Sequence, residues 1–331
     1  MNVGGAFPVK VPCALCGSHA YTAQYPLTFG AIVRCDDCGF CYVNPRMPSA
    51  HLLDKLQQWA EQDVVDPERL RIAYDPRTLS LYTGYLKRMA ALCPPGRLLD
   101  IGCSSGAFMH AAQQQGWSTE GLEIGRASAR HAAEKLGVPV HQGSLYDFDA
   151  APGSYDAIVF LEVIEHLEYP LGALARIEKW LRPGGVLLVS TPNYDSLYRR
   201  LFGTCWWVVN CEDEHIQFFN RQSLEKALAQ HHLQVRWTRI RGLDLAGMMQ
   251  SWRARQPGAA RMESADTEAQ DYYAARSRKE AIKSVLADIG LLRLARGALS
   301  AIDWATSLRH SPAHAIGEQL VMLTAKLENK P

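Results

Sequence analysis

The stretch Leu98–Met109, LLDIGCSSGAFM, constrains the fold of this chain more than any other. It begins with an apolar run, Leu98–Ile101, whose length suits a buried parallel strand. Gly102 and Gly106 follow the run, and Ala107–Gln115 then has the pattern of a helix. A strand, a glycine-containing turn and a helix together make a cradle for a ligand at the helix N-terminus. Glycine lets the backbone approach a ligand closely and lets the helix pack against the strand.

Two acidic residues narrow the kind of ligand. Asp100 stands at the carboxyl end of the first strand, where it can accept hydrogen bonds from a cationic or hydroxyl-bearing group. A second expected strand, Trp117–Glu123, ends in an acid 17 residues beyond Gly106. Doubly wound folds place a ribose-binding carboxylate at about this distance. A glycine turn alone also occurs in other nucleotide sites and in plain turns, and no GxGxxG motif of the pyrophosphate type is present.

The later part of the chain alternates further apolar runs with helical patterns. The expected strands are Val138–His141, Tyr155–Phe160, Val186–Ser190, Gln234–Ile240 and Gln319–Leu327. The expected helices are Ala50–Gln62 with Ser49 as N-cap, Arg77–Leu92, Arg126–Leu136, Leu174–Leu181 and Arg221–Gln230 with Asn220 as cap. Between Tyr194 and His215 the pattern indicates a long connection, and a connection of this length usually carries function or forms a lid.

The motifs DIGCSSG at 100–106, Glu123, YDAIVFLEVIEHL at 155–167 and LRPGGVLLVSTPN at 181–193 occur in that order. In these motifs the chain resembles the class I S-adenosylmethionine (SAM)-dependent methyltransferases over roughly 78–245 and again at 317–328. The resemblance implies an α/β fold, with a Rossmann-like seven-stranded, mostly parallel sheet whose last strand is antiparallel. It implies SAM as cofactor. The implied cofactor-binding residues are Asp100, Gly102, Cys103, Gly106, Glu123, Ser144, Leu145, Leu161 and Glu162. Ser104 departs from the family, which often has glycine there.

Four cysteines near the N-terminus have the spacing of a metal site. Cys13-x2-Cys16 is followed after 18 residues by Cys35-x2-Cys38, and Tyr21–Val33 between them has the composition of a β-hairpin. Two such pairs are typical of a tetrahedral zinc site with four thiolate ligands and no open position, so we expect structural Zn²⁺. A redox dithiol and structurally unrelated cysteines are the alternatives. The module resembles the zinc ribbons fused ahead of bacterial small-molecule methyltransferases.

A second constellation follows the expected strand Tyr155–Phe160. Glu162, Glu165 and His166 stand at i, i+3 and i+4, so they share one side if the backbone turns helical, and His215 occurs later. This ExxEH pattern resembles the O-methyltransferases of ubiquinone biosynthesis, and with the distant histidine it resembles plant small-RNA 2′-O-methyltransferases. Three interpretations stay open. The four residues hold a divalent ion such as Mg²⁺, or they act without metal, with His166 or His215 as general base and Glu165 in catalysis. In the third, Glu162 lies beside the cofactor, Glu165 caps the helix and His166 makes a structural hydrogen bond.

Composition excludes several partners and locations. The net charge of +1 provides no general attraction to nucleic acid or to an anionic membrane. The N-terminus lacks a signal-peptide pattern, and no apolar run has the length of a membrane span, so we expect a cytoplasmic protein. With 331 residues, 47% of them apolar, the chain has room for a large core and a small module.

We expect four regions: a zinc ribbon at 1–48, a methyltransferase core at 49–245, a helical insertion at 246–316 and a final strand with a tail at 317–331. Within the insertion, Lys279–Leu308 has a helical pattern with one apolar face. Three interpretations remain for the insertion: a cap over the site, a surface for a homodimer, or contact with a membrane or a lipid-linked acceptor.

The reaction implied by the resemblance is methyl transfer from SAM to a small-molecule acceptor, at oxygen, on a natural-product, sugar or quinone-like compound. A metal-dependent RNA 2′-O-methyltransferase and a non-catalytic SAM-binding scaffold are the alternatives. The balanced charge and the lack of a basic, aromatic-rich run oppose the first alternative. The intact glycine turn and Glu123 oppose the second.

Overall fold

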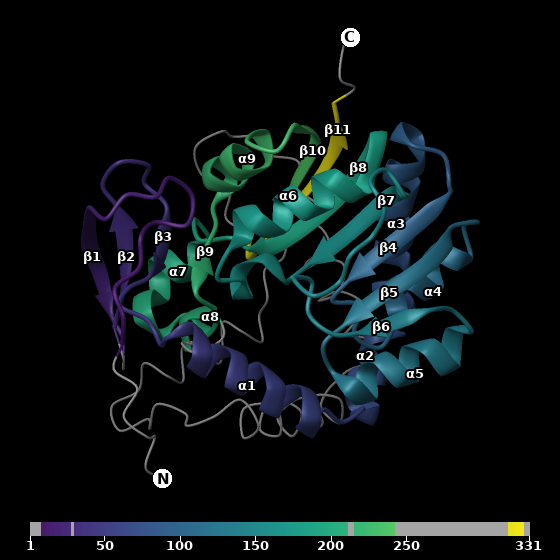
Figure 1. Ribbon diagram of the computed structural model, residues 1–331, viewed down its shortest axis with the longest axis horizontal. Helices are drawn as coiled ribbons and strands as arrows, with labels where there is room; N and C mark the ends of the chain where they lie inside the picture. Colours follow the sequence, from purple (N-terminus) through teal and green to yellow (C-terminus); the bar gives the residue numbers. More distant parts are fainter. Residues whose placement is uncertain (1–7, 28–29, 211–214, 242–316, 328–331) are drawn as a thin grey trace, which may run out of the picture. The chain divides into compact units, whose positions relative to one another are not determined.

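The computed structural model describes residues 8–27, 30–210, 215–241 and 317–327 (Figure 1). The chain divides into two compact units. The first comprises Met1–Pro192, Ile216–Thr238 and Val321–Pro331, and the second comprises Asn193–His215 and Arg239–Leu320. The expected insertion at 246–316, with its helical stretch, lies outside the described residues.

The N-terminal module of the first unit is a small antiparallel sheet. Its strands are β1 (Tyr21–Pro26), β2 (Ala31–Cys35), β3 (Cys41–Val43) and β9 (Gln217–Phe218), in the order β1-β2-β3-β9. The β1–β2 hairpin agrees with the expectation for Tyr21–Val33. No sequence pattern predicted β9, which comes from much later in the chain and pairs antiparallel with β3.

Three helices connect this module to the large sheet: α1 (Ser49–Gln62), α2 (Pro67–Ala73) and α3 (Pro76–Leu92). Asp66 and Asp75 cap α2 and α3, and a proline follows each cap at the first helical position, as expected at helix starts. The prediction of Ser49 as N-cap of α1 is wrong. Ser49 is the first residue of the helix, and its hydroxyl donates instead to Glu168 Oε1 at 2.9 Å.

The large sheet has seven strands in the order β10-β11-β8-β7-β4-β5-β6, mostly parallel with one antiparallel end, as the resemblance implied. Its strands are β4 (Arg97–Ile101), β5 (Ser118–Glu123), β6 (Val140–Gln142), β7 (Tyr155–Leu161), β8 (Leu181–Pro192), β10 (Leu233–Arg241) and β11 (Gln319–Lys326). β8 begins five residues before the expected Val186, because Leu181 already pairs with Tyr155; the register then shifts before Val186 pairs with Ala157.

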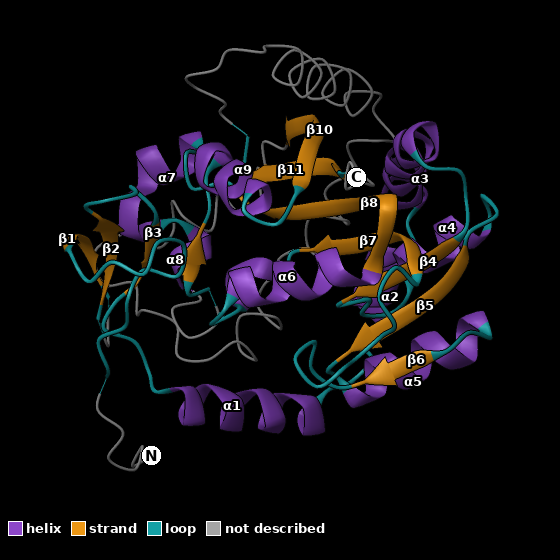
Figure 2. Cartoon of the chain, turned by 45° about the horizontal axis from the view of Figure 1, so that its top comes forward, coloured by secondary structure: helices purple, strands orange, loops and turns teal. Residues whose placement is uncertain are grey.

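The remaining helices of the first unit are α4 (Ala107–Gln113), α5 (Arg126–Leu136), the single 3-10 turn η1 (Ile164–His166), α6 (Pro170–Trp180) and α9 (Arg221–Ala229). Apolar side chains of α3 and α4 pack on one face of the sheet in a core that includes Leu98, Val159 and Leu188. Figure 2 shows α6 running beside β8. The predicted Asn220 cap of α9 is confirmed, with Ser223 completing a capping box.

The described part of the second unit shows that the long connection expected after Tyr194 contains short helices. It contains α7 (Leu197–Phe202), the 3-10 turn η2 (Gly203–Cys205) and α8 (Trp207–Asn210). Trp206 is fully buried, and its indole N–H donates to Glu318 Oε2 at 2.8 Å. Among the described residues, no helix has the length and apolar character needed to cross a bilayer.

Candidate functional site

The glycine turn between β4 and α4 has the backbone that a close-fitting ligand cradle requires. Gly102 has φ +76 and Gly106 has φ +81, both in the left-handed region that favours glycine. A Cβ added to Gly102 would lie 2.5 Å from Val163 Cγ2, and one added to Gly106 would lie 2.7 Å from Leu136 Cδ1. Ser104 also has a positive φ, of 47°, which explains why glycine is favourable at this position. The turn therefore depends on small residues at two points.

Glu123, at the end of β5, is held by the backbone of the two loops beside it. Its Oε2 accepts from Ser104 N–H at 2.7 Å, and its Oε1 accepts from Gly125 N–H at 2.8 Å. Burial raises the pKa of Glu123, while the N–H groups of Gly125 and Ser104 oppose that rise by favouring the charged form. The glycine turn and the acid predicted to bind ribose are thus one hydrogen-bonded assembly.

Asp100 lies on the neighbouring strand and is 3% exposed. Burial, and then the charge of Glu123, raise the pKa of Asp100 to about 8. Two carboxylates in one apolar environment disfavour each other's ionisation, and a cation placed near them favours it. This edge of the sheet is consequently suited to a positively charged ligand with hydroxyl groups.

The other predicted cofactor residues border the same strand ends. Leu145 is buried after β6, and Ser144 Oγ accepts from Tyr146 N–H at 3.2 Å. Leu161 is the last residue of β7. Cys103 directs its thiol into a core cluster with Met109 and Ala132. Only the backbone of Cys103 is therefore placed to meet a ligand.

Two contacts near the turn were not assigned a role from the sequence. The Tyr74 hydroxyl donates to Ser105 O at 2.7 Å, so the start of α3 is tied to the glycine turn. Asp63, the residue after α1, accepts from Ser128 N–H at 2.7 Å and from Ser128 Oγ at 3.1 Å, and so caps α5 from outside. An aspartate in a loop distant in sequence carries no signal that would reveal such a cap.

The ExxEH segment differs from the expected helix face. Only Ile164–His166 is helical, as a 3-10 turn, and Glu162 has φ +53. The condition for the three polar side chains to share one helical face is therefore not met, because Glu162 lies before the turn and has a left-handed φ. Glu162 Oε1 accepts from Ser190 Oγ at 2.6 Å.

Glu165 and His166 remain adjacent. Glu165 is 2% exposed, and neither of its carboxylate oxygens has a hydrogen-bond partner within the described residues. Burial, followed by the charge of Glu162, raises the pKa of Glu165 well above its usual value. His166 Nε2 lies 4.0 Å from Glu165 Oε1. A buried carboxylate without a partner beside an imidazole is a group that can accept a proton or a cation.

His215 belongs to the second unit and is buried. Its Nδ1 pairs with Val208 O at 2.9 Å. A carbonyl partner requires Nδ1 to donate, which puts the lone pair on Nε2, the tautomer of a base or metal ligand. The next residue, Ile216, donates its N–H to Glu165 O at 3.1 Å.

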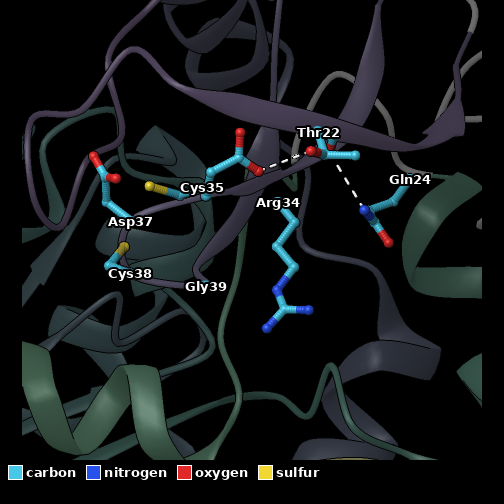
Figure 3. A pocket seen from close by; sticks show the side chains of 8 residues that line it. Thr22, Gln24, Arg34, Cys35, Asp37, Cys38 and Gly39 are labelled. Carbon is cyan, nitrogen blue, oxygen red and sulfur yellow. Dashed lines mark hydrogen bonds between the residues drawn. The ribbon is translucent and has the colours of Figure 1, made fainter.

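The four N-terminal cysteines form a cluster, as their spacing predicted. Their sulfurs all lie within 4.8 Å of one another, with 3.5 Å between Cys13 and Cys38 and between Cys16 and Cys35. A tetrahedral Zn²⁺ with Zn–S bonds of about 2.3 Å needs sulfurs about 3.8 Å apart, so the donor set fits the ion. Cys35 and Cys38 also line a surface hollow of about 530 Å³ beside Arg34 (Figure 3).

Comparison with known proteins agrees with this geometry. Residues 74–237 match a family model described as a methyltransferase domain. A ubiquinone biosynthesis O-methyltransferase of Xanthomonas campestris is 30% identical over 162 residues, which are 45% of this chain and 66% of that one. One of the same name from Nitrosococcus oceani is 32% identical over 115 residues, 33% of this chain and 48% of that one. The chain thus spans less than two thirds of the length of these curated relatives.

Among solved structures, geranyl diphosphate methyltransferase in complex with SAM matches with 18% identity and a TM-score of 0.46, covering 82% of this chain and 95% of that one. The family model thus marks residues 74–237 as similar to a methyltransferase domain, and the sheet order is the one that the resemblance to class I SAM-dependent methyltransferases implied. Within this class, the curated relatives reported above are O-methyltransferases.

Proposed function

We propose that this protein transfers a methyl group from SAM to an oxygen atom of a small-molecule acceptor. The observation that carries the proposal is the assembly of Asp100, the glycine turn and Glu123 at the carboxyl end of adjacent parallel strands. This is the place where open α/β sheets bind their ligands. The O-methyltransferase relatives favour oxygen as the accepting atom and a quinone-like, sugar or natural-product acceptor.

The binding side consists of residues that favour a cationic nucleoside. SAM, when bound, supplies an electrophilic methyl group on a sulfonium. Gly102 and Gly106 keep the turn open to it, Asp100 offers a carboxylate to its cationic methionine part, and Glu123 offers one to its ribose hydroxyls. Leu145 and Leu161 exclude water. Orientation of the two reactants alone accounts for about 7–11 kcal/mol in well-aligned systems.

The acceptor side consists of Glu165 and His166, which take up the proton that the hydroxyl loses. The unpartnered, buried carboxylate of Glu165 favours this assignment. The metal content of the purified protein distinguishes the two forms of the reaction at the ExxEH segment. Two ions per chain, one of them in the cysteine cluster, support a metal-assisted reaction, and a single ion in the cysteine cluster supports a reaction without metal at the acceptor side.

The experiment is a SAM-dependent methylation assay of the purified protein against a panel of catechols, quinols and sugars, with S-adenosylhomocysteine measured as product. His166→Gln should lower kcat by about 10²–10⁴-fold, the usual contribution of a general base. His141→Gln is the matched control, because His141 also lies beside a glutamate, 2.7 Å from Glu120 Oε1, but on β6. Failure of the wild-type protein to bind SAM would reject the proposed function. Equal losses in the two variants would reject the role of His166.

A further inference from the structure

The strand β9 belongs to the N-terminal ribbon, although it lies far away in the sequence. Cys41 pairs with Phe218 and Tyr42 with Gln217, in antiparallel register. Val43 N–H extends the pairing by donating to Ile216 O at 3.0 Å. The ribbon sheet is therefore complete only when a strand from the methyltransferase chain joins it.

The same strand holds the turn that carries Glu165 and His166. Ile216 N–H donates to Glu165 O at 3.1 Å, and Gln217 Nε2 donates to Leu167 O at 3.1 Å. Gln217 is 1% exposed, so its side chain is fixed between β3 and the turn. Carbonyls on either side of His166 are thus held by Gln217 of β9 and by Ile216, the residue before it.

A second connection runs through Arg46, just after β3. Its Nη2 lies 3.2 Å from Glu168 Oε1, and Ser49 Oγ donates to the same oxygen at 2.9 Å. The Arg46 side chain is 7% exposed and that of Glu168 is 14% exposed. Removing one partner of a pair this buried leaves the other charge uncompensated. Loss of Arg46 should therefore displace the side chain of Glu168.

The cysteine cluster controls the position of β3. Cys35 ends β2 and Cys38 lies in the turn before β3, so two of the four sulfurs bracket the β2–β3 connection. Cys35 N–H donates to Phe40 O at 2.8 Å within this connection. Small modules of this kind fold only with their metal, because their own core is too small. Metal at the cysteines therefore fixes β3, and β3 fixes β9 and Arg46.

We propose that the metal-bound ribbon is the positioning element of the acceptor side: through β9, Gln217 and Arg46 it holds the turn Ile164–His166 in place. This inference rests on the proposed assignment of Glu165 and His166 to the acceptor side. It gives the ribbon a role in the reaction, with Gln217 and Arg46 as positioning residues. None of the hydrogen bonds and ion pairs named in this chain of contacts, which all lie within the described residues, is made by β4 or β5.

The first test measures hydrogen exchange of the full-length protein before and after the cysteine-bound metal is removed by a chelator. Amides of 164–168 and 216–219 should exchange about tenfold faster or more, because each lost hydrogen bond accounts for up to about one order of magnitude. Amides of 98–106 and 118–125 should be unchanged, and so should the Kd for SAM. Unchanged exchange at 164–168 would overturn the inference, and so would equal deprotection of the whole sheet.

The second test keeps the metal and cuts one connection. Arg46→Met should accelerate hydrogen exchange at 164–168. It should also lower kcat in the methylation assay, run with a catechol that the wild-type protein methylates, while the Kd for SAM stays within twofold of the wild-type value. Arg46→Lys should restore much of the exchange protection and of kcat, because a single N–H···O contact to Glu168 is enough to hold that residue. Arg221→Met, which breaks the exposed Arg221–Glu225 pair on α9, is the control. Equal effects of the Arg46→Met and Arg221→Met variants would overturn the positioning role. If the wild-type protein fails to bind SAM, the proposed function is rejected. The hydrogen-exchange result would still show whether the ribbon holds the turn Ile164–His166.

Discussion

Replacing Asp100 with asparagine tests the electrostatics of the SAM side. Asp100 is buried beside Glu123, and burial together with that charge raises its pKa from 3.8 to about 8. The folded protein therefore keeps this proton over a pH range in which the unfolded chain releases it. Because the folded state binds more protons, stability falls as pH rises from about 3.8 to about 8 and then levels off.

The size of this effect follows from the two pKa values. Between pH 5 and pH 9 the wild-type protein should lose roughly 4 kcal/mol of unfolding free energy through Asp100 alone. Asp100→Asn removes the ionisation, so its stability relative to wild type should rise by that amount across the same range. The measurement is urea unfolding without SAM at pH 5, 7 and 9. Asp149→Asn is the control, because Asp149 is an exposed carboxylate.

Binding of SAM should show the opposite preference. A cationic ligand favours the ionised carboxylate, so wild-type affinity should increase as pH rises towards 8, with release of a proton. Asp100→Asn should bind SAM about 10- to 100-fold more weakly, since hydrogen bonds to charged groups contribute about 1.5–3 kcal/mol. Its affinity should no longer vary with pH through this group. A variant with wild-type affinity and a wild-type pH profile would refute the reasoning.

Three further predictions concern the glycine turn, the ribose contact and the ribbon. Gly106→Ala should lower the free energy of unfolding by more than about 2 kcal/mol and abolish SAM binding, because it combines a left-handed φ with a clash against Leu136. The control Gly137→Ala, at φ +65 with open space around it, should lower the free energy of unfolding by about 1 kcal/mol and bind SAM normally. Equal losses of unfolding free energy in the two variants would contradict this. Glu123→Ala should raise the calorimetric Kd for SAM at least about tenfold, and an unchanged Kd would exclude the ribose contact. Elemental analysis should find at least one zinc per chain, and its removal should lower Tm; metal-free cysteines in freshly purified protein would contradict the ribbon.

The large sheet could be predicted from the sequence because its signals are local. Apolar runs such as Tyr155–Phe160 suit strands buried on both faces, and these form β7 and its neighbours. Glycine at 102 and 106 is needed for a positive φ, so the turn between β4 and α4 is also encoded locally. The cysteine cluster follows from spacing alone, because two CxxC pairs bring four sulfurs together whatever lies between them.

The contacts that were missed join residues far apart in the sequence. β9 has two residues and acquires its strand conformation only by pairing with β3. Asp63 caps α5 across a long separation, and Ser49 bonds Glu168 although its sequence position suggested a helix cap. Glu162 was placed on a helical face because ExxEH has the right spacing, but its left-handed φ depends on how β7 meets the following turn. The periodicity of apolar residues contains no information on such contacts between distant parts of the chain.

The arrangement of carboxylates explains why this edge of the sheet is suited to SAM chemistry. Asp100, Glu123 and Glu165 are all buried, at or just beyond the ends of β4, β5 and β7, and each has a raised pKa. A protein selected for stability alone would place apolar side chains there, because buried carboxylates without cations cost free energy. The cost is offset when a cation binds. In the proposed complex, the cationic methionine part of SAM would supply that cation beside Asp100.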